Sequence, residues 1–447
     1  MELRKKELSS TTRVMLGTGI DPQDGAMMQA LYSRSPESAE VHYAKTQKVG
    51  SGKFMSKYYV GYGHPSIADC GSITLFFEGV SMLAAKAIQQ NPLYSGQETS
   101  TRYIDMSTRE MYVPEGRDDI AHIQNICMSF YKLILPDLVH KIRTEHPLQS
   151  DEDPKEYERA VNARAFDIAR AWIPAGMTTQ LSWHTNMRQA TDHLRVLLCH
   201  PLKEVSDIAE AAVELLAGKY PETFSDIQRR PPSVWMQNTV KDLAYVHPHH
   251  NVAKIVPGDI YVGSMINEWY YNYFKEELRT RPEREALPKE CGPAITTELA
   301  FDIDFGSFRD IQRHRHGLAL MPLLTPNMFE GWYIDELPEQ WKQTALNNIA
   351  YIQEFYQRSK YDVEHDQYAI PMGFCVRYHA TKPLDSFVYM LELRTGKTVH
   401  PTLRSRMIQT AKCFMEHFKD VRVHADLRPD DWTVRRGAQT IVPVEGA

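Results

Sequence analysis

Three adjacent side chains that can carry positive charge, Arg313, His314 and Arg315, stand in the stretch QRHRHGLALMP at residues 312–322. Such a group usually faces an anion, and arginine binds phosphate through two parallel hydrogen bonds. The residues that follow are mostly apolar, so no polar partner lies just downstream. Cations at a helix end also complement the helix dipole. The triplet therefore predicts either an anion site or a charged helix end.

A second polar stretch, QETSTR at residues 97–102, combines Glu98, Ser100 and Arg102. Hydroxyl and backbone donors beside an arginine suit a dianionic phosphate. A carboxylate such as that of Glu98 can accept a hydrogen bond from a hydroxyl group or orient an arginine. Taken alone, the same stretch also fits a polar turn in which Ser100 or Thr101 caps a helix.

Both stretches follow the same succession of expected elements, which indicates an internal repeat. Residues 75–103 and 299–326 each begin with an apolar, strand-like segment that contains an acidic residue, and each continues into a helical run. A cation, Lys86 or Arg309, precedes the triplet position by four residues. At that position the first half has Gln-Asn-Pro, 223 positions before Arg-His-Arg.

A second pair of segments supports the repeat. DIARAWIPAGMTTQLSW at 167–183 aligns with DQYAIPMGFCVRYHA at 366–380 on their Ile-Pro dipeptides, at an offset of 197. The smaller offset predicts extra residues in the first half, and the acidic, polar stretch at 143–156 fits a loop insertion. Amphipathic helices are expected after both segments, one ending near Gly218 and one starting with Pro401 in its first turn.

The fold class expected from these patterns is α+β, with two tandem related domains. The boundary falls in QRRPPS at 228–233, where two prolines stop any helix. This places a first domain at residues 1–230 and a second at 231–447.

Composition narrows the class of protein. The 447 residues are 43% hydrophobic and 24% charged, which is typical of a globular protein with sizeable cores. A net charge of −6 argues against nucleic acid as a partner, although a local phosphate pocket remains compatible with it. The N-terminus lacks an apolar run of signal length, and no segment reaches about 18 uninterrupted apolar residues, so neither secretion nor a membrane span is expected.

Three further features favour structural interpretations. Six scattered cysteines without a C-x-x-C pair suit reduced thiols in a cytoplasm, not a disulfide framework or a zinc site. The cluster HPHH at 247–250 lacks acidic or cysteine partners at ligand spacing and is interpreted as a surface loop, so no metal is expected. NEWYYNYF at 267–274 predicts a packed amphipathic helix, or alternatively an aromatic floor for a ring ligand.

The run YGHPSIADCGSITLFFEGVS, followed by SGQETSTRY, resembles the flavin-dependent thymidylate synthases. That family has an Arg-His-Arg motif, a Gly-His-x-Ser/Thr segment upstream and a Glu-x-Ser-x-Arg segment downstream. Its members are about half this length, are homotetramers and build each site from several subunits. The resemblance covers nearly the whole chain as two fused family units, each mainly an antiparallel sheet with packed helices.

The family's motifs are divided between the two halves. The first half keeps the nucleotide-side motif Glu98, Ser100 and Arg102, while the second keeps Arg-His-Arg and has Met321, Pro322 and Leu323 at the Glu-x-Ser positions. The resemblance implies cofactor contacts and substrate contacts at separate positions. The cofactor-binding positions are Arg313, His314, Arg315, His64, Ser66 and Asn186; the substrate-binding positions are Glu98, Ser100, Arg102, Arg170 and Arg394.

These losses are complementary, because the second half has Gln367 and Pro383 where the first has Arg170 and Asn186, and the first has Leu197 where the second has Arg394. Without the resemblance, Arg170 and Arg394 could each equally be a partner in a structural ion pair. By the resemblance, Arg394 reads the uracil ring and acts in catalysis together with Ser100.

The implied reaction is reductive C5 methylation of dUMP to dTMP, with FAD as cofactor and methylenetetrahydrofolate and NADPH as co-substrates. In such enzymes the cofactor carries most of the chemistry, and none of the six cysteines is assigned as a nucleophile. Four family units correspond to two fused chains, so a cytoplasmic homodimer is expected. Two alternatives stay open: a paralogue that keeps the fold without catalysis, and an enzyme acting on another pyrimidine nucleotide.

Overall fold

The computed structural model describes residues 2–7, 13–33, 35, 37–52, 65–246, 258–359 and 363–429. The chain divides into two compact units. Unit 1 consists of Met1–Phe77, Leu93–Gln97 and Leu181–Ala244, and unit 2 consists of Glu78–Pro92, Glu98–Gln180 and Tyr245–Ala447. Unit 2 therefore contains segments from both halves of the sequence. The expected domain boundary at residue 230 is a different division, and it stays a prediction.

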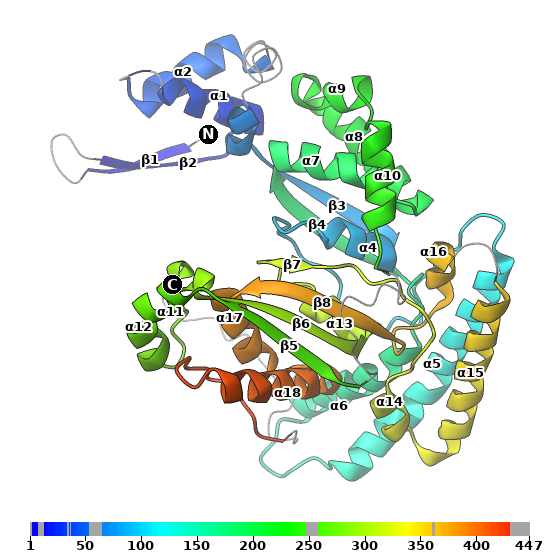
Figure 1. Ribbon diagram of the computed structural model, residues 1–447. Helices are drawn as coiled ribbons and strands as arrows, with labels where there is room; N and C mark the ends of the chain where they lie inside the picture. The colour runs from blue at the N-terminus through cyan, green and yellow to red at the C-terminus, as the bar shows by residue number, and fades with distance from the viewer. Residues whose placement is uncertain are drawn as a thin grey trace. The chain divides into compact units, whose positions relative to one another are not determined.

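Unit 1 is mainly helical, with one antiparallel hairpin of β1 and β2 (Figure 1). Its elements are β1 (Glu2–Glu7), β2 (Arg13–Thr18), α1 (Pro22–Tyr32), α2 (Ala39–Val49), the 3₁₀ helix η2 (Pro65–Cys70), α7 (Met187–Leu197), α8 (Lys203–Lys219), α9 (Pro221–Arg229) and α10 (Val234–Leu243). The strands β3 (Ser72–Ser81) and β4 (Thr178–Asn186) pair with each other, and each contains a point of division between the units.

Unit 2 is built on a four-stranded sheet in the order β5, β6, β8, β7. These strands are β5 (Ile260–Ile266), β6 (Ile295–Asp304), β7 (Leu318–Ala319) and β8 (Cys375–Pro383), and every neighbouring pair is antiparallel. The helices α17 (Leu384–Arg394) and α18 (Pro401–His417) pack on this sheet (Figure 1). The ten residues of β6 are nearly all buried, as expected for a strand covered on both faces.

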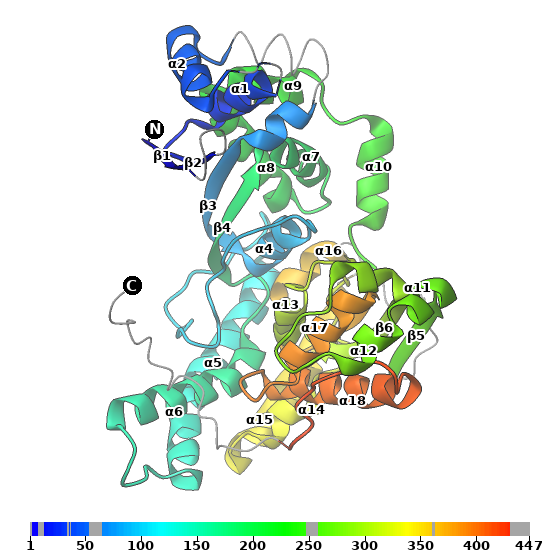
Figure 2. The ribbon, with the colours of Figure 1, turned by 90° about the vertical axis from the view of Figure 1, so that its left-hand side faces the viewer.

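The remaining helices of unit 2 include two long ones, α5 (Asp118–Glu145) and α15 (Glu339–Arg358), which lie side by side with α6 (Pro154–Ala169) next to α5 (Figures 1 and 2). Buried residues of α5 recur at helical spacing, so one apolar stripe faces the core. The other elements are α4 (Met82–Gln89), η3 (Arg170–Trp172), α11 (Glu268–Tyr273), α12 (Lys275–Thr280), η4 (Lys289–Ala294), α13 (Phe305–Ile311), α14 (Gly331–Asp335), α16 (Val363–Asp366) and η5 (Gln367–Ala369).

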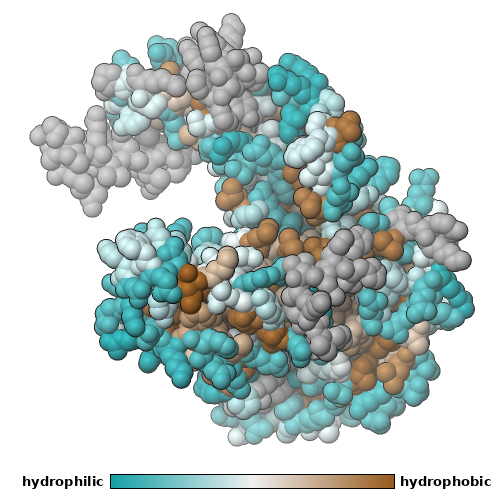
Figure 3. Space-filling view, viewed as in Figure 1, coloured by the Kyte–Doolittle hydropathy of each residue, from teal (hydrophilic) through white to brown (hydrophobic). Residues whose placement is uncertain are grey.

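The surface of this protein is mostly hydrophilic on the face shown in Figure 3, where apolar residues form small, separate groups. Among the described residues, no helix combines the length and the apolar character needed to cross a bilayer.

The secondary structure repeats as the sequence predicted. Strands β3 and β6 each have ten residues and begin 223 positions apart, and each runs directly into a helix, α4 or α13. Strands β4 and β8 each have nine residues at an offset of 197, and the helices that follow, α7 and α17, each have eleven. The expected α+β fold with two tandem related parts is confirmed by these matched elements.

The Ile-Pro segments join the two repeats inside unit 2. Ala175 donates its backbone N–H to the carbonyl of Ile370 at 2.9 Å, and the equivalent Met372 donates to the carbonyl of Ile173 at 2.9 Å. These two equivalent residues thus make the same bond in opposite directions, as in an isologous interface. The dipeptides that aligned in the sequence are therefore contact points between the repeats.

Tight packing at this junction between the repeats requires glycine at two equivalent positions, Gly176 and Gly373. A Cβ atom on Gly176 would lie 2.3 Å from Nε2 of Gln124 and 2.8 Å from the carbonyl oxygens of Tyr112 and Tyr368. Its counterpart Gly373 is equally enclosed, because a Cβ atom there would lie 2.4 Å from the ring of Phe329.

Two local expectations need correction. The extra residues at 143–156 are not only a loop, since α5 extends to Glu145 and α6 begins at Pro154, where Asp153 caps it by accepting from two backbone N–H groups. The helix expected in NEWYYNYF is present as α11, but it is not packed as predicted, because Trp269 and Tyr273 are 64% and 66% exposed. Short helices of this kind bury little, and these two rings stack on each other instead.

The other expected helix boundaries are confirmed. α9 ends at Arg229, α10 begins at Val234, and the two prolines lie between them. α8 ends at Lys219, and α18 begins at Pro401.

Candidate functional site

Most of the residues singled out in the sequence lie in unit 2. Ser66 and Asn186 belong to unit 1, where Ser66 is an exposed residue of η2 and Asn186 caps α7 by accepting from the backbone of Gln189 at 2.8 Å. His64 lies outside the described residues, as does the histidine cluster at 247–250. The site described below consists only of unit 2 residues.

Four arginines lie near enough to Asp310, at the end of α13, for their charges to act on its carboxylate. Burial alone raises the pKa of Asp310, but the charges of Arg102, Arg170, Arg313 and Arg394 lower it, and the net shift is downward. The carboxylate oxygen Oδ2 lies 3.7 Å from Nη1 of Arg170. The arginines come from both repeats, so the fold brings together motifs that are about 300 positions apart in the sequence.

Arg102 is held by a carboxylate of its own repeat. Its Nε and Nη2 donate to the two oxygens of Asp167 at 2.8 and 3.0 Å, a planar two-bond pairing. The backbone N–H of Arg102 donates to the hydroxyl of Ser100 at 3.3 Å, which makes QETSTR a turn as well as a donor surface.

Arg170 is completely buried and is bound by the second repeat. Its Nη2 donates to the hydroxyl of Ser307 at 2.9 Å, and its Nε donates to the hydroxyl of Tyr333 at 3.3 Å. Oδ1 of Asp304 lies 3.5 Å from the same Nη2. Burial alone would lower the pKa of this guanidinium, yet the surrounding acidic groups raise it above the ordinary value. Arg170 is therefore a fixed, buried charge.

Glu98 is also saturated by protein contacts. Its Oε1 accepts from Nη2 of Arg309 at 2.5 Å, and its Oε2 accepts from Nζ of Lys86 at 2.8 Å and from Nε2 of Gln89 at 2.9 Å. Burial alone raises the pKa of Glu98, but the two cations lower it well below its usual range. Of the two expected alternatives, an orienting contact with an arginine is the one present here.

The cations that bind Glu98 occupy equivalent positions in the repeats. Lys86 lies in α4 and Arg309 in α13, 223 positions apart. Burial lowers the pKa of Lys86 to about 8, although the neighbouring Glu98 opposes that shift. The carboxylate of Glu98 in the first repeat thus pairs with one cation from each repeat.

The three residues of the basic triplet have different contacts. His314 accepts on Nε2 from Nε of Arg394 at 2.8 Å, so this ring nitrogen carries no proton, and burial followed by the nearby cations lowers the pKa of His314 to about 2. Arg315 donates from Nε to the carbonyl of Gln89 at 3.1 Å. Arg313 is exposed, and no hydrogen bond of its guanidinium to another described residue is seen.

Arg394 is aligned by two contacts. Besides the bond to His314, its Nη2 donates to the backbone carbonyl of Asp310 at 2.8 Å. Burial and the neighbouring Arg313 and Arg102 lower the pKa of Arg394, while Asp310 opposes the shift. The arginine expected to read a ring and the arginine expected to bind phosphate are therefore close enough to repel each other.

A buried polar network behind Arg170 was missed in the sequence. Asp304 accepts from the hydroxyls of Tyr333 at 2.8 Å and Thr402 at 2.6 Å, and it caps α13 by accepting from the backbone of Ser307. His400 lies 2.8 Å from the hydroxyl of Thr402 and 3.2 Å from the backbone carbonyl of Asp167. Burial and the nearby Arg170 hold the pKa of His400 well below its usual value. These residues do not recur at a regular spacing in the sequence, so no motif predicts the network. Only Asp304, at the position before a helix, could be recognised in the sequence as a helix cap.

Neither thiol nor metal chemistry is indicated in the described part of the chain. Burial raises the pKa of Cys127 to about 12, the opposite of what a thiolate nucleophile needs. No group of three or more His, Cys, Asp or Glu side chains suited to a metal ion occurs among the described residues.

The fold and this site define a chain with two related α+β parts and a cluster of arginines around Asp310. Residues 21–222 match the model of the thymidylate synthase complementing protein family. This part of the chain is therefore similar to that family, in agreement with the resemblance to flavin-dependent thymidylate synthases. The match lies within the expected first domain.

Similar proteins of comparable length occur in distant organisms. The chain is 22% identical to a UPF0159 protein of Chlamydia pneumoniae, with 82% of this chain and 78% of that protein covered. It is 23% identical to a UPF0159 protein of Thermoplasma acidophilum, with 86% and 91% covered. These relatives span both halves, as expected for a double-length chain.

Two solved structures of the flavin-dependent thymidylate synthase ThyX from Helicobacter pylori, both with FAD and dUMP, are also similar. Each is 18% identical in sequence; one alignment covers 46% of this chain and 94% of that one, and the other covers 52% and 100%. The TM-scores are 0.29 and 0.30, too low for the superposition itself to be evidence of function.

Proposed function

We propose that this protein is a flavin-dependent thymidylate synthase-like enzyme that methylates C5 of dUMP reductively to form dTMP. The observation that carries the proposal is the grouping of arginines from both repeats around Asp310: Arg394 donates to its backbone carbonyl at 2.8 Å, and the charges of Arg102 and Arg313 lower the pKa of its carboxylate. The family match of residues 21–222 supports the same activity. A nucleotide monophosphate has an anionic end and a ring with carbonyl groups, and this cluster offers donors for both.

In this proposal each expected residue keeps a distinct role. Arg102 and Ser100 bind the phosphate, while Glu98 and Arg170 act by holding neighbouring charges in place. Arg394 donates to a carbonyl of the pyrimidine ring and stabilises the charge that develops there. Its bonds to His314 and to the Asp310 carbonyl fix the orientation of the guanidinium.

The same cluster fits an anionic cofactor. Four guanidinium groups stand near the carboxylates of Asp167, Asp304 and Asp310, so positive charge is in excess, and Arg313 presents an exposed guanidinium. The residues of this cluster proposed to hold FAD are Arg313, His314 and Arg315. By the family resemblance alone, His64, Ser66 and Asn186 are further proposed cofactor contacts. When bound, FAD would supply reducing equivalents and carry the one-carbon unit from methylenetetrahydrofolate, with NADPH as the reductant.

The direct test is product formation. Purified protein with dUMP, FAD, methylenetetrahydrofolate and NADPH should yield dTMP in a chromatographic assay, and Arg394→Ala should abolish it. Exposed Arg358 on α15 provides the matched control, since Arg358→Ala should leave turnover unchanged. Absence of dTMP from a flavin-loaded, folded protein would refute the proposed reaction.

A paralogue without catalysis is the second candidate, and one observation favours it. Both oxygens of Glu98 and both oxygens of Asp167 are already occupied by cations of the chain, which is how a structural ion-pair network is arranged. A purified protein without a flavin absorbance spectrum would favour this candidate. Flavin binding with turnover of a different pyrimidine nucleotide would favour the related enzyme instead.

The assembly we propose is a homodimer. Two chains would bring four repeats together, the same number as in a homotetramer of the half-length family members. Light scattering at working concentration should give twice the mass of one chain, and a monomer would contradict it. The six cysteines are free, which supports the expected cytoplasmic location.

A further inference from the structure

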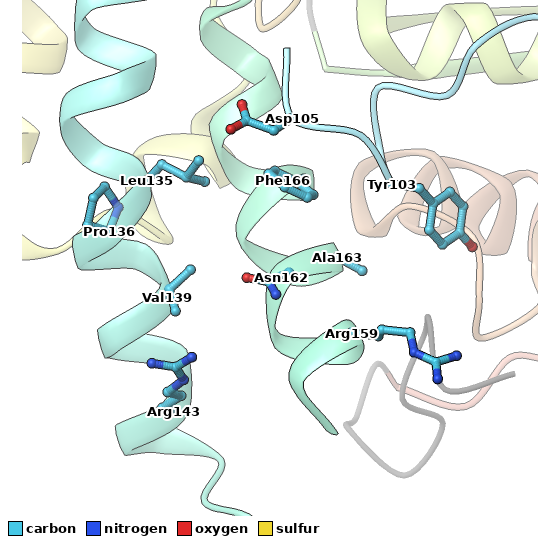
Figure 4. A pocket seen from close by; sticks show the side chains of 10 residues that line it. All are labelled: Tyr103, Asp105, Leu135, Pro136, Val139, Arg143, Arg159, Asn162, Ala163 and Phe166. Carbon is cyan, nitrogen blue, oxygen red and sulfur yellow. The ribbon is translucent and has the colours of Figure 1, made fainter. Parts of the chain in front are cut away.

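A groove between α5 and α6 is not used by the proposed reaction. It encloses about 940 Å³, the size of a small-molecule pocket. Its apolar wall combines Leu135, Pro136 and Val139 of α5 with Ala163 and Phe166 of α6, and Figure 4 shows these side chains along the two helices.

Two cations mark one end of this groove. Arg143 of α5 and Arg159 of α6 lie toward the same end in Figure 4, while Asp105 lies toward the other. Arg143 is paired with Glu158 at 2.6 Å. Arg159 is exposed, and no ion pair or hydrogen bond of its side chain with another described residue is seen. Asp105 is occupied, because Tyr131 and Ser107 donate to it.

The groove belongs to the first repeat alone. Its wall requires the 28 residues of α5 and the 16 residues of α6, whereas the second repeat has 20 residues in α15 and only four in α16. The longer helices of the first repeat therefore supply the walls of this groove.

The groove also adjoins the arginine cluster along the chain. Phe166 lines the groove, while the next residue, Asp167, is buried and binds Arg102. Tyr103, the residue that follows Arg102 in the sequence, also lines the groove. Consecutive helix positions point about 100° apart, so α6 presents one face to each site.

From this arrangement we infer that the groove binds a small organic anion with a flat apolar body. The ring packs against Phe166 and the aliphatic side chains of α5, and the anionic group meets the guanidinium of Arg159 on α6. Charge complementarity selects an anion, because Arg159 is the group at that end that has no carboxylate bound to it among the described residues. This inference does not depend on the proposed reaction.

The test uses the full-length protein and 8-anilinonaphthalene-1-sulfonate, an aromatic sulfonate whose fluorescence rises in apolar sites. Uncharged N-phenyl-1-naphthylamine provides the same rings without the anion. Asn162→Phe fills the groove from an exposed lining position, and Arg159→Glu reverses its charge. Arg358→Glu makes the same change in net charge on α15, outside the groove.

The sulfonate should bind about tenfold or more weakly to Arg159→Glu and to Asn162→Phe, and normally to Arg358→Glu. The uncharged probe should lose affinity only for Asn162→Phe. Unchanged sulfonate binding by Asn162→Phe would overturn the site. Equal binding by wild type and Arg159→Glu would overturn the anionic class of ligand. Circular dichroism of every variant confirms that each one is folded.

Discussion

Arg394 donates from Nε to Nε2 of His314 at 2.8 Å, which links the arginine expected to read a pyrimidine ring to the centre of the basic triplet. His314 is therefore an acceptor and not a third cation. This explains why no polar partner follows the triplet in the sequence: its partners come from α17, from the backbone of α4 and, by proposal, from a ligand.

Arg102→Ala and Arg394→Ala should each weaken dUMP binding about ten- to a hundredfold, because a charge-assisted contact contributes roughly 1.5–3 kcal/mol. If both arginines meet one ligand, the two losses should be coupled in a double-mutant cycle measured by titration calorimetry. Arg358→Ala, which removes an exposed arginine paired to Glu354 on α15, is the control. An unchanged affinity in Arg394→Ala would contradict the shared site.

Within the triplet, Arg313→Ala should release FAD while leaving the free energy of unfolding unchanged, because its exposed guanidinium has no observed bond to a described residue. Arg315→Ala should lower the free energy of unfolding by about 1 kcal/mol, since it removes the bond to the Gln89 carbonyl. Flavin absorbance and urea denaturation measure the two effects. Full flavin occupancy in the Arg313→Ala, Arg315→Ala double variant would argue against the role of the triplet.

Glu98→Gln should lower the free energy of unfolding by about 3–5 kcal/mol, because Lys86 and Arg309 would be left as buried cations without a counter-charge. Glu276→Gln removes an exposed partner of Arg279 and should have no measurable effect. Urea denaturation compares the two variants. A loss of dUMP affinity at unchanged stability would instead favour a direct contact between Glu98 and the ribose.

His314 should make stability depend on pH. Burial and neighbouring cations lower its pKa to about 2 in the folded protein, so below the unfolded pKa of about 6.5 the unfolded state binds the extra proton. Stability should therefore fall as the pH drops from 6.5 to 5, by about 1.4 kcal/mol per pH unit from this residue. His314→Gln keeps an acceptor for Arg394 and should reduce that slope, whereas exposed His417→Gln should leave it as in wild type. Equal slopes in both variants would refute the assignment.

Gly176→Ala should lower the free energy of unfolding by about 1–3 kcal/mol, because the new methyl group would overlap Gln124 and the carbonyls of Tyr112 and Tyr368. Gly331→Ala is the matched control, since nothing lies within 4 Å of its added Cβ and α14 begins there. Thermal or urea unfolding distinguishes them. Equal stability of Gly176→Ala and wild type would show that the junction between repeats adapts easily.

Local patterns in the sequence were sufficient for the repeat. The apolar strands, the helices after them and the Ile-Pro segments recur at offsets of 223 and 197, and the structure has matched elements at those offsets. Periodicity, caps and prolines act over a few residues, so a sequence determines them by itself. The residues of the family motifs were visible for the same reason.

Tertiary structure alone decided how those residues are used. The pairing of Glu98 with Arg309, the burial of Arg170 against Asp304 and the neutral state of His314 depend on contacts between segments far apart in the chain. The groove of α5 and α6 likewise follows from the packing of two helices and not from a motif. An ion pair or a pocket forms where the folded backbone brings side chains together, and the spacing of residues along the chain does not specify that distance.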